Sequence, residues 1–204
     1  MAMPEGAVIS GHVVQGRRRP LHATLVVRLK KARQALGMDR APLSLAAGLS
    51  VNTVANVERG SMPGLDTVEK LARALGVSPC YLAYGVEGEA PPPLAGGALR
   101  AAGCGARLQQ LREHRGLSKL CLGATAGLAG SALFPIESGR VIPSVATAEA
   151  LAKALDVSPC WLAFGEGADP IAEPDQAAAE ASAVRYRPPR KPSAPKRSTV
   201  PKKP

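Results

Sequence analysis

Two asparagines, Asn52 and Asn56, have the type and spacing that most directly indicate a chemistry. They stand four residues apart, so on a helix they would share one face. An asparagine amide can pair bidentately with N6 and N7 of adenine, and each good pair is worth about 1–3 kcal/mol of discrimination. The alternative is that both amides are only solvated. Which of these two interpretations holds depends on the helix or loop that carries the two asparagines.

Histidine and cysteine, which often serve catalysis or metal binding, form no such constellation. The three histidines, His12, His22 and His114, lie in no motif with a nucleophile or a metal-ligand partner. The cysteines contain no C-x-x-C pair, and they are Cys80, Cys104, Cys121 and Cys160. We therefore expect no enzyme, no zinc site and no other cofactor, no small-molecule ligand, and four reduced, largely buried thiols.

The charge of the chain indicates a polyanionic partner. Its 204 residues carry a formal net charge of +10, with a pI near 9.9. Residues 184–204 hold eight basic and no acidic residues, whereas residues 166–183 hold five acidic and no basic ones. Much of the positive excess therefore lies at the end of the chain, apart from any folded domain.

Nothing in the sequence predicts a membrane segment or a secretion signal. No apolar run approaches the roughly 20 residues that span a bilayer. The start of the chain, with Glu5 and no early Lys or Arg, lacks the charged region that opens a signal peptide. We expect a cytoplasmic, nucleoid-associated protein with no membrane contact.

The chain contains two copies of one unit. Residues 76–85 recur at 156–165, an offset of 80, and the five residues 71–75 match 151–155 at the same offset. Further upstream the offset is 79, because one residue is inserted between Gly139 and Pro143. The duplication predicts two domains with the same fold.

Each copy is predicted to form short helices. In the first copy, apolar residues at helical spacing between Leu25 and Leu36 indicate a helix that stops near Gly37. Asp39 and Ser118 are the expected N-caps of the second helices, which Gly48 and Gly127 end.

The remaining helices follow the same logic. Ser50 is expected to cap a third helix that runs to Arg59, residues 68–75 give a fourth, and Ser78-Pro79 opens a short fifth. Hydrophobic residues make up 46% of the chain and aromatic ones only 3%, which suits small helical cores of Leu, Val and Ala. The expected fold class is all-α, with two tandem five-helix domains.

These elements resemble the phage-repressor helix-turn-helix domain of the Cro-like (XRE) family, which is of the lambda-repressor-like type. The resemblance covers both copies and implies DNA binding with the third helix in the major groove. The residues that carry it are Leu45-Ala46, Gly48-Leu49-Ser50, Val54, Val57-Glu58-Arg59-Gly60, Pro63 and Leu71-Ala72-Arg73-Ala74-Leu75-Gly76-Val77.

The resemblance also implies a set of DNA-contacting residues in the first copy. Arg40 takes the position where the family often has a phosphate-contacting Gln, and its charge is compatible with that contact. Leu49, Val54 and Val57 are expected in the core, and Glu58 is expected to hold the end of the third helix together with Arg59. The residues expected along the groove are Ser50, Val51, Asn52, Thr53, Ala55 and Asn56. A solvated helix face is expected for Lys30, Lys31 and Arg33.

The second copy departs from the pattern at its third helix, expected from Ala129 to Ser138. Gly130 and Ser131 replace Val51 and Asn52, while Phe134 and Pro135 replace Ala55 and Asn56. A proline inside a helix costs about 3 kcal/mol or more, so we expect this helix to be short or kinked and a poor reader of bases.

The second copy also has an alternative role. Phe134 is expected to be exposed beside Leu133, and the two residues are expected to mediate self-association or the binding of another protein. Weak phosphate contacts from Arg112, Arg115 or Lys119 could accompany this role. The alternative is a purely structural role, in which the second copy packs against the first as a rigid extension.

The domain boundaries follow from these assignments. We expect an arm at 1–24, domain 1 at 25–85, a linker at 86–103, domain 2 at 104–165, and an acidic then basic, disordered, Pro-rich tail at 166–204. The tail is either a non-specific DNA-tracking arm or a solubilising segment. The run Arg17-Arg18-Arg19 is likewise either a minor-groove contact or solvated.

Two functions remain open at this stage. The first is a transcriptional regulator, a repressor, that binds double-stranded DNA through domain 1, as a homodimer formed through domain 2 on a palindromic site. The second is a protein-interaction or antitoxin-like adaptor module that keeps the fold and binds DNA weakly.

Overall fold

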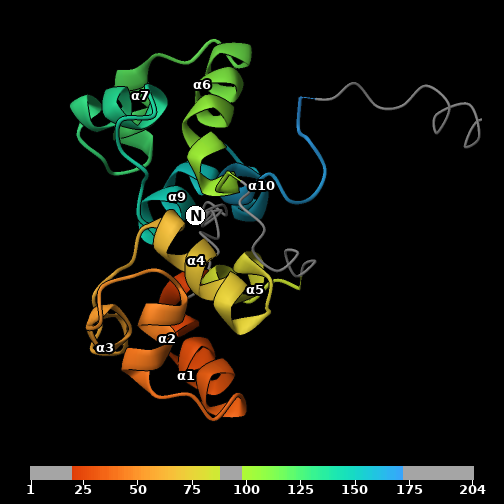
Figure 1. Ribbon diagram of the computed structural model, residues 1–204. Coiled ribbons are helices and arrows are strands. Elements are labelled where there is room, and N and C mark those ends of the chain that lie inside the picture. The colour runs from red at the N-terminus through yellow and green to blue at the C-terminus, as the bar shows by residue number, and fades with distance from the viewer. Residues whose placement is uncertain (1–19, 88–97, 172–204) are drawn as a thin grey trace, which may run out of the picture. The chain divides into compact units, whose positions relative to one another are not determined.

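The computed structural model describes residues 20–87 and 98–171, and within these ranges the fold is all-α (Figure 1). The described residues up to Pro170 form one compact unit, so both repeats belong to the same unit. The arm residues 1–19, the linker residues 88–97 and the tail residues 172–204 lie outside the described residues, and so do the expectations for Arg17-Arg18-Arg19 and for the basic tail.

The first repeat has the five expected α-helices, preceded by a short 3-10 helix. Its elements are η1 Leu21–Thr24, α1 Leu25–Ala35, α2 Arg40–Ala46, α3 Thr53–Glu58, α4 Leu65–Leu75 and α5 Pro79–Tyr84. The second repeat has the same order with one additional 3-10 helix. Its elements are η2 Arg100–Gly103, α6 Cys104–His114, α7 Lys119–Thr125, η3 Gly130–Ala132, α8 Leu133–Glu137, α9 Val145–Ala154 and α10 Pro159–Phe164.

Each repeat has a core of aliphatic side chains drawn from all its helices. In the first, Leu29, Leu43, Val54, Leu65 and Val68 are fully buried. Their counterparts in the second include Leu108, Leu122, Leu133 and Val145. The aliphatic cores explain how a chain with so few aromatic residues folds.

Helix ends follow the predicted capping pattern at several positions. Ser78 and Ser158 accept backbone N–H bonds at the starts of α5 and α10, each with a proline at the first helical position. Ser118 likewise caps α7, as expected. Asp39 stands at the N-cap of α2, but its side chain makes no capping hydrogen bond.

The ends of α4 and α9 differ in one informative residue. Gly76 ends α4 in the left-handed conformation, at φ 65°. Asp156, its counterpart after α9, has φ 47° and is the only non-glycine residue with positive φ in the described ranges. Glycine adopts this conformation without a Cβ penalty, so the second repeat carries a local strain that the first avoids.

Two arginines perform the same structural task in the two repeats. Arg28 of α1 donates to the carbonyl oxygens of Leu82 and Ala83 at the end of α5, at 3.0 and 2.6 Å. Arg107 of α6 does the same for Leu162 and Ala163 at the end of α10, at 3.0 and 2.8 Å. Each arginine therefore ties the first α-helix of its repeat to the last.

The segments before α1 and α6 extend the folded region beyond the expected boundaries. The structure places η1 in the range assigned to the disordered arm and η2 in the range assigned to the linker. Their backbone N–H groups bond to carboxylates far away in the sequence, Glu149 and Glu69 respectively. Such long-range partners leave no local sequence pattern, which is why the sequence predicts too long an arm and too long a linker.

Candidate nucleic-acid interface

Helices α2 and α3 of the first repeat pack as the expected helix-turn-helix. Buried Ser44 of α2 accepts a hydrogen bond from the backbone N–H of Val54 in α3, at 3.1 Å, and donates to the carbonyl oxygen of Arg40 at 3.0 Å. Gly48 in the turn has φ 65°, which favours glycine there. The position of α3 is thus fixed by a polar contact as well as by the buried side chains of Val54 and Val57.

The buried leucine of α2 is Leu43, with no exposed surface, whereas Leu45 is 63% exposed. Leu45-Ala46 therefore does not lie on the buried face of α2, as its match to the family motif would require. The buried positions are held by Leu43 and Ser44. Leu49, which is expected in the core, is half-buried.

Most of the residues expected along the groove face outward. Ser50, Val51, Asn52 and Asn56 are exposed, with Val51 at 46%, while Thr53 and Ala55 are half-buried. The opposite face of α3, formed by Val54 and Val57, is buried. Both asparagines of the chain, which has no others, therefore lie on the exposed side of one helix and its first turn.

The third helix begins later than expected. Ser50 does not cap it, since α3 starts at Thr53 and its N-cap residue is Asn52, which makes no side-chain capping bond. Residues 51 and 52 form a turn in which the N–H of Thr53 bonds to the carbonyl oxygen of Ser50, at 2.9 Å. Ser50 contributes its backbone, and its hydroxyl is not used as a cap.

A carboxylate fixes the far end of α3. Glu58 is buried and accepts from Arg33 Nε at 2.9 Å and from Arg40 Nε at 2.6 Å. Burial by itself raises the pKa of Glu58, but the hydrogen bonds and charges of Arg40 and Arg33 outweigh it and hold this pKa below its usual value. Glu58 thus has the expected structural role.

Two arginines around Glu58 differ from expectation. Arg33 is not part of a solvated face, because its side chain is only 11% exposed and pairs with Glu58. Arg40 also pairs with Glu58, although its side chain remains 57% exposed. A phosphate contact from Arg40 therefore stays a prediction, and it would have to coexist with this ion pair.

Another contact orients one of the two asparagines. Arg59 Nη1 donates to Asn56 Oδ1 at 3.3 Å on the exposed side of the helix. The amide nitrogen of Asn56 remains available as a donor, and the cation of Arg59 lies beside it. An amide and a cation at one point of an exposed surface can hydrogen-bond to a base edge and to a neighbouring phosphate.

The third helix of the second repeat is short and begins with a 3-10 turn, in line with the expectation of a short or kinked helix. Pro135 is the third residue of α8, so its missing N–H falls in the first turn. The cost of an interior proline is therefore avoided, because the α-helix starts late. Gly123, the counterpart of Ser44, lets α7 lie close to η3, because a Cβ there would lie 3.2 Å from Gly130 Cα.

Of the two residues expected to form a protein contact, only Phe134 is exposed. Leu133 has no exposed surface, because it takes the core position of Val54. Phe134 is 54% exposed, with Lys119 Nζ at 5.3 Å and the guanidinium of Arg140 at 5.5 Å from its ring centre. A cation–π arrangement of this kind stabilises an exposed ring beside positive charge.

The three cations expected to make weak phosphate contacts each have a partner within the second repeat. Buried Arg112 pairs with Glu137 at 2.7 Å, as Arg33 pairs with Glu58. Arg115 donates to the carbonyl oxygen of Leu155, and Lys119 lies 3.3 Å from Glu137. Of these, Lys119 has the position most similar to that of exposed Arg40.

Sequence reasoning missed the residues that hold the site. These are Ser44, Arg28 with Arg107, and Glu69 with Glu149, and the last two pairs match between the repeats. Identity of a polar residue in both copies is the signal that could have identified these two pairs, whereas Ser44, whose counterpart is Gly123, has no such signal.

Among the described residues, the cysteines, the potential metal ligands and the apolar helices give no further site. Cys80, Cys104 and Cys160 are buried free thiols and Cys121 is an exposed one, so the expectation of largely buried thiols holds for three of the four. The described residues contain no cluster of His, Cys, Asp and Glu that could hold a metal ion. Among the same residues no single helix is long and apolar enough to cross a membrane, and only α7 with the segment 130–137 passes that test as a pair, bent by 113°.

Comparison with known protein families identifies both repeats. A family model described as "Helix-turn-helix" matches residues 29–82, and one described as "Helix-turn-helix domain" matches residues 104–163. No curated protein and no solved structure matches the chain. Helix-turn-helix domains are DNA-binding modules, characteristic of regulators rather than of enzymes. With the geometry of α2–α3 and α7–α8, these matches show that the chain is a tandem helix-turn-helix protein of the Cro-like (XRE) family.

Proposed function

We propose that this protein is a sequence-specific transcriptional repressor that reads the major groove of DNA with α3 of its first repeat. The observation that carries the proposal is the exposed face of α3, where Asn52 and Asn56 stand outward over a buried Val54 and Val57. Amides so placed can pair with adenine edges, and Val51 or Ala55 can contact a thymine methyl.

The charges around α3 support the same proposal. Exposed Arg59 lies beside Asn56, and Arg40 projects from the start of α2 with more than half of its side chain exposed. Cations beside a base-reading helix serve phosphate contacts, which set the register on the duplex. A repressor would act by occupying a promoter through this interface.

The proposal is tested by selecting fragments from random DNA with the full chain. Wild-type protein should enrich a defined motif, and the double variant Asn52→Ala, Asn56→Ala should lose that motif, because about 1–3 kcal/mol of discrimination disappears with each amide pair. The matched control is Ser131→Ala, since Ser131 is the counterpart of Asn52 in the second repeat. The control should enrich the same motif as wild type.

Two results would contradict the proposal. The first is enrichment of nothing, and the second is equal binding of all DNA with a steep salt dependence, which would assign the affinity to non-specific charge. Repression itself is measured with a reporter placed behind the selected motif. Its expression should fall with wild-type protein and not with the double variant.

A second candidate function is supported by the surface of the second repeat. Leu120, Phe134 and Val141 are 73%, 54% and 49% exposed there. Exposed large apolar side chains such as these are typical of protein contacts, as in an adaptor subunit or in a homodimer formed through this repeat. The variant Phe134→Ser should abolish such a contact and leave the motif selected by α3 unchanged.

A further inference from the structure

The two repeats are joined by a reciprocal pair of backbone hydrogen bonds. The N–H of Leu65 donates to the carbonyl oxygen of Pro143 at 3.0 Å, and the N–H of Val145 donates to that of Pro63 at 3.1 Å. Gly64 and Ser144 form the antiparallel bridge between them. At the offset of 80, Pro63 matches Pro143 and Leu65 matches Val145, so each repeat offers the same atoms to the other.

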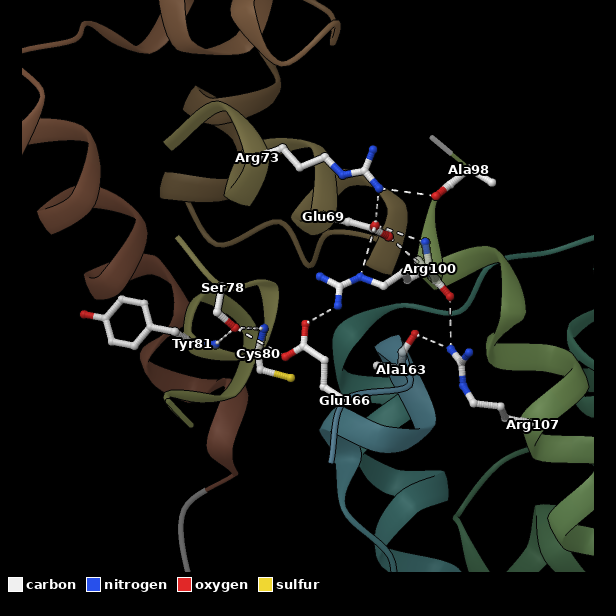
Figure 2. A network of polar contacts seen from close by, with 11 residues as sticks. Glu69, Arg73, Ser78, Cys80, Tyr81, Ala98, Arg100, Arg107, Ala163 and Glu166 are labelled. Atoms are coloured by element: carbon white, nitrogen blue, oxygen red, sulfur yellow. Dashed lines mark hydrogen bonds and ion pairs between the residues drawn. The ribbon is translucent and has the colours of Figure 1, made fainter. Parts of the chain in front are cut away.

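A second pair of contacts repeats this exchange with side chains. Glu149 of α9 accepts from the N–H groups of Leu21 and His22 in η1, at 2.6 and 3.1 Å. Glu69 of α4 accepts from those of Arg100 and Ala101 in η2, at 3.0 and 2.8 Å (Figure 2). The carboxylate of each repeat thus binds the start of the other repeat's first helix.

The fifth helices complete the exchange. Cys80 of α5 and Cys160 of α10, which match at the offset of 80, are both buried, and α5 packs against α10. Glu166, after α10, pairs with Arg100 at 3.0 Å and accepts from Ser78 Oγ at 3.4 Å (Figure 2). Equivalent residues facing one another are the mark of an isologous, two-fold contact.

Proteins of two identical subunits form such contacts between chains, whereas here one chain forms them within itself. We propose that a single copy of this protein acts as a fused dimer and occupies one DNA site that is asymmetric in sequence, rather than a palindrome bound by two copies. This inference rests on the proposed function and adds to it the stoichiometry and the symmetry of the DNA site.

The asymmetry follows from the two third helices. Where α3 exposes Asn52 and Asn56, the second repeat has Ser131 and Pro135. Around exposed Phe134 the second repeat has two cations, exposed Arg140 and half-buried Lys119, whose charges suit a phosphate backbone and carry no base code. One half of the site is therefore read by base contacts, and the other half is held by charge.

The experiment combines mass with footprinting on the DNA selected by the full chain. Light scattering of the free protein should give the mass of one chain, 21.0 kDa, and the DNA complex should contain one chain for each duplex. Hydroxyl-radical footprinting should protect two segments about one helical turn apart. Base preference should be confined to one segment. Two chains for each duplex on a palindromic motif, or protection of a single segment, would overturn the inference.

Variants separate the two halves of the site. Lys119→Ala with Arg140→Ala should weaken binding to all sequences alike and lower the salt slope by about 1 for each phosphate that is no longer neutralised. Asn52→Ala with Asn56→Ala should instead remove the base preference and keep the stoichiometry of one chain. If the first pair of substitutions leaves affinity unchanged, the second repeat does not contact DNA and the inference fails.

The failure of the proposed function is recognised separately. In that case the protein selects no DNA motif at all. In contrast, selection of a motif by two chains refutes only the fused dimer.

Discussion

The guanidinium of Arg33 in α1 lies 2.9 Å from a carboxylate oxygen of Glu58, the last residue of α3. The same relationship recurs between Arg112 and Glu137 in the second repeat, at 2.7 Å. In each repeat, this ion pair holds the C-terminal end of the third helix against the first helix. Because the pair is kept in both copies while the exposed residues of the helix differ, it belongs to the scaffold rather than to the reading of bases.

Replacing Glu58 should destabilise the first repeat in a pH-dependent way. Its pKa is lower in the folded state than in the unfolded chain, so its stabilisation is present above the unfolded pKa, about 4.3, and is lost as the pH falls through the folded value. Glu58→Gln should cost about 3 kcal/mol at pH 7, because it leaves Arg33 without its ionic partner. Urea unfolding at pH 7 and at about pH 3 measures this difference.

The control is Glu113→Gln, which removes an exposed carboxylate that lies 3.1 Å from Arg112. It should leave the unfolding midpoint at pH 7 unchanged. An equal drop in stability for both variants would show that general charge, rather than the buried pair, sets the stability.

Ser44→Ala should weaken the packing of α2 on α3. The substitution leaves the buried N–H of Val54 without its acceptor, which costs about 1–3 kcal/mol. Thermal unfolding measures the effect, and the exposed Ser61→Ala is the control that should leave the melting temperature unchanged. Equal melting temperatures for all three proteins would argue against the role of the Ser44 hydroxyl.

Gly105→Ala should strongly destabilise the second repeat. A Cβ at this position would fall on the carbonyl oxygen of Ile136 and 3.3 Å from Glu137 Cα, so the backbone of α8 would have to move. Overpacking of this kind costs about 1–3 kcal/mol or more. Ala106→Gly, at the exposed neighbouring position, should cost only about 1 kcal/mol through helix propensity. A smaller destabilisation for Gly105→Ala than for this control would contradict the close packing.

Asp156→Gly should stabilise the protein. Asp156 holds the left-handed conformation that Gly76 holds in the first repeat, and a side chain there costs about 1 kcal/mol that glycine does not. The melting temperature should rise for Asp156→Gly and fall for the reverse substitution in the first repeat, Gly76→Asp. A fall for Asp156→Gly would show that the aspartate side chain contributes more than its backbone costs.

The native protein should react with a thiol reagent at Cys121 alone. Cys121 is exposed, whereas burial raises the pKa of the Cys104 thiol to about 11. Interaction with the Cys160 thiol, together with burial, raises the pKa of Cys80. Because thiolates are the reactive species, mass spectrometry should show one modification in the native state and four after unfolding. Cys121→Ser should show none in the native state, and fast labelling of Cys80 would refute the closed packing of the fifth helices.

The fold was predictable because its signals are local and occur twice. Ser78-Pro79 and Ser158-Pro159 each open a helix, and the glycines at 48 and 127 each end one with a positive φ. Helix periodicity, capping and the repeat all indicate the same five helices in each copy. These features depend on neighbours within a few residues, which a sequence displays directly.

The parts that escaped prediction depend on distant contacts or on helical phase. Leu133 matches Val54 at the offset of 79, so its burial is marked by the repeat and not by the local pattern around Phe134. The partner of Arg33 is Glu58, 25 residues away, and nothing in the local pattern marks the pair. The same holds for Glu69 and Glu149, whose backbone partners lie in the segments that the sequence assigns to a linker and an arm.

The bridge between Gly64 and Ser144 has a consequence for dosage. Two separate subunits dissociate on dilution, whereas two units of one chain stay paired at any concentration. Two helix-turn-helix units held in this way are paired even when a cell contains a single molecule. Occupancy of a target should then follow a simple one-site saturation curve, without the threshold that a dissociating dimer imposes.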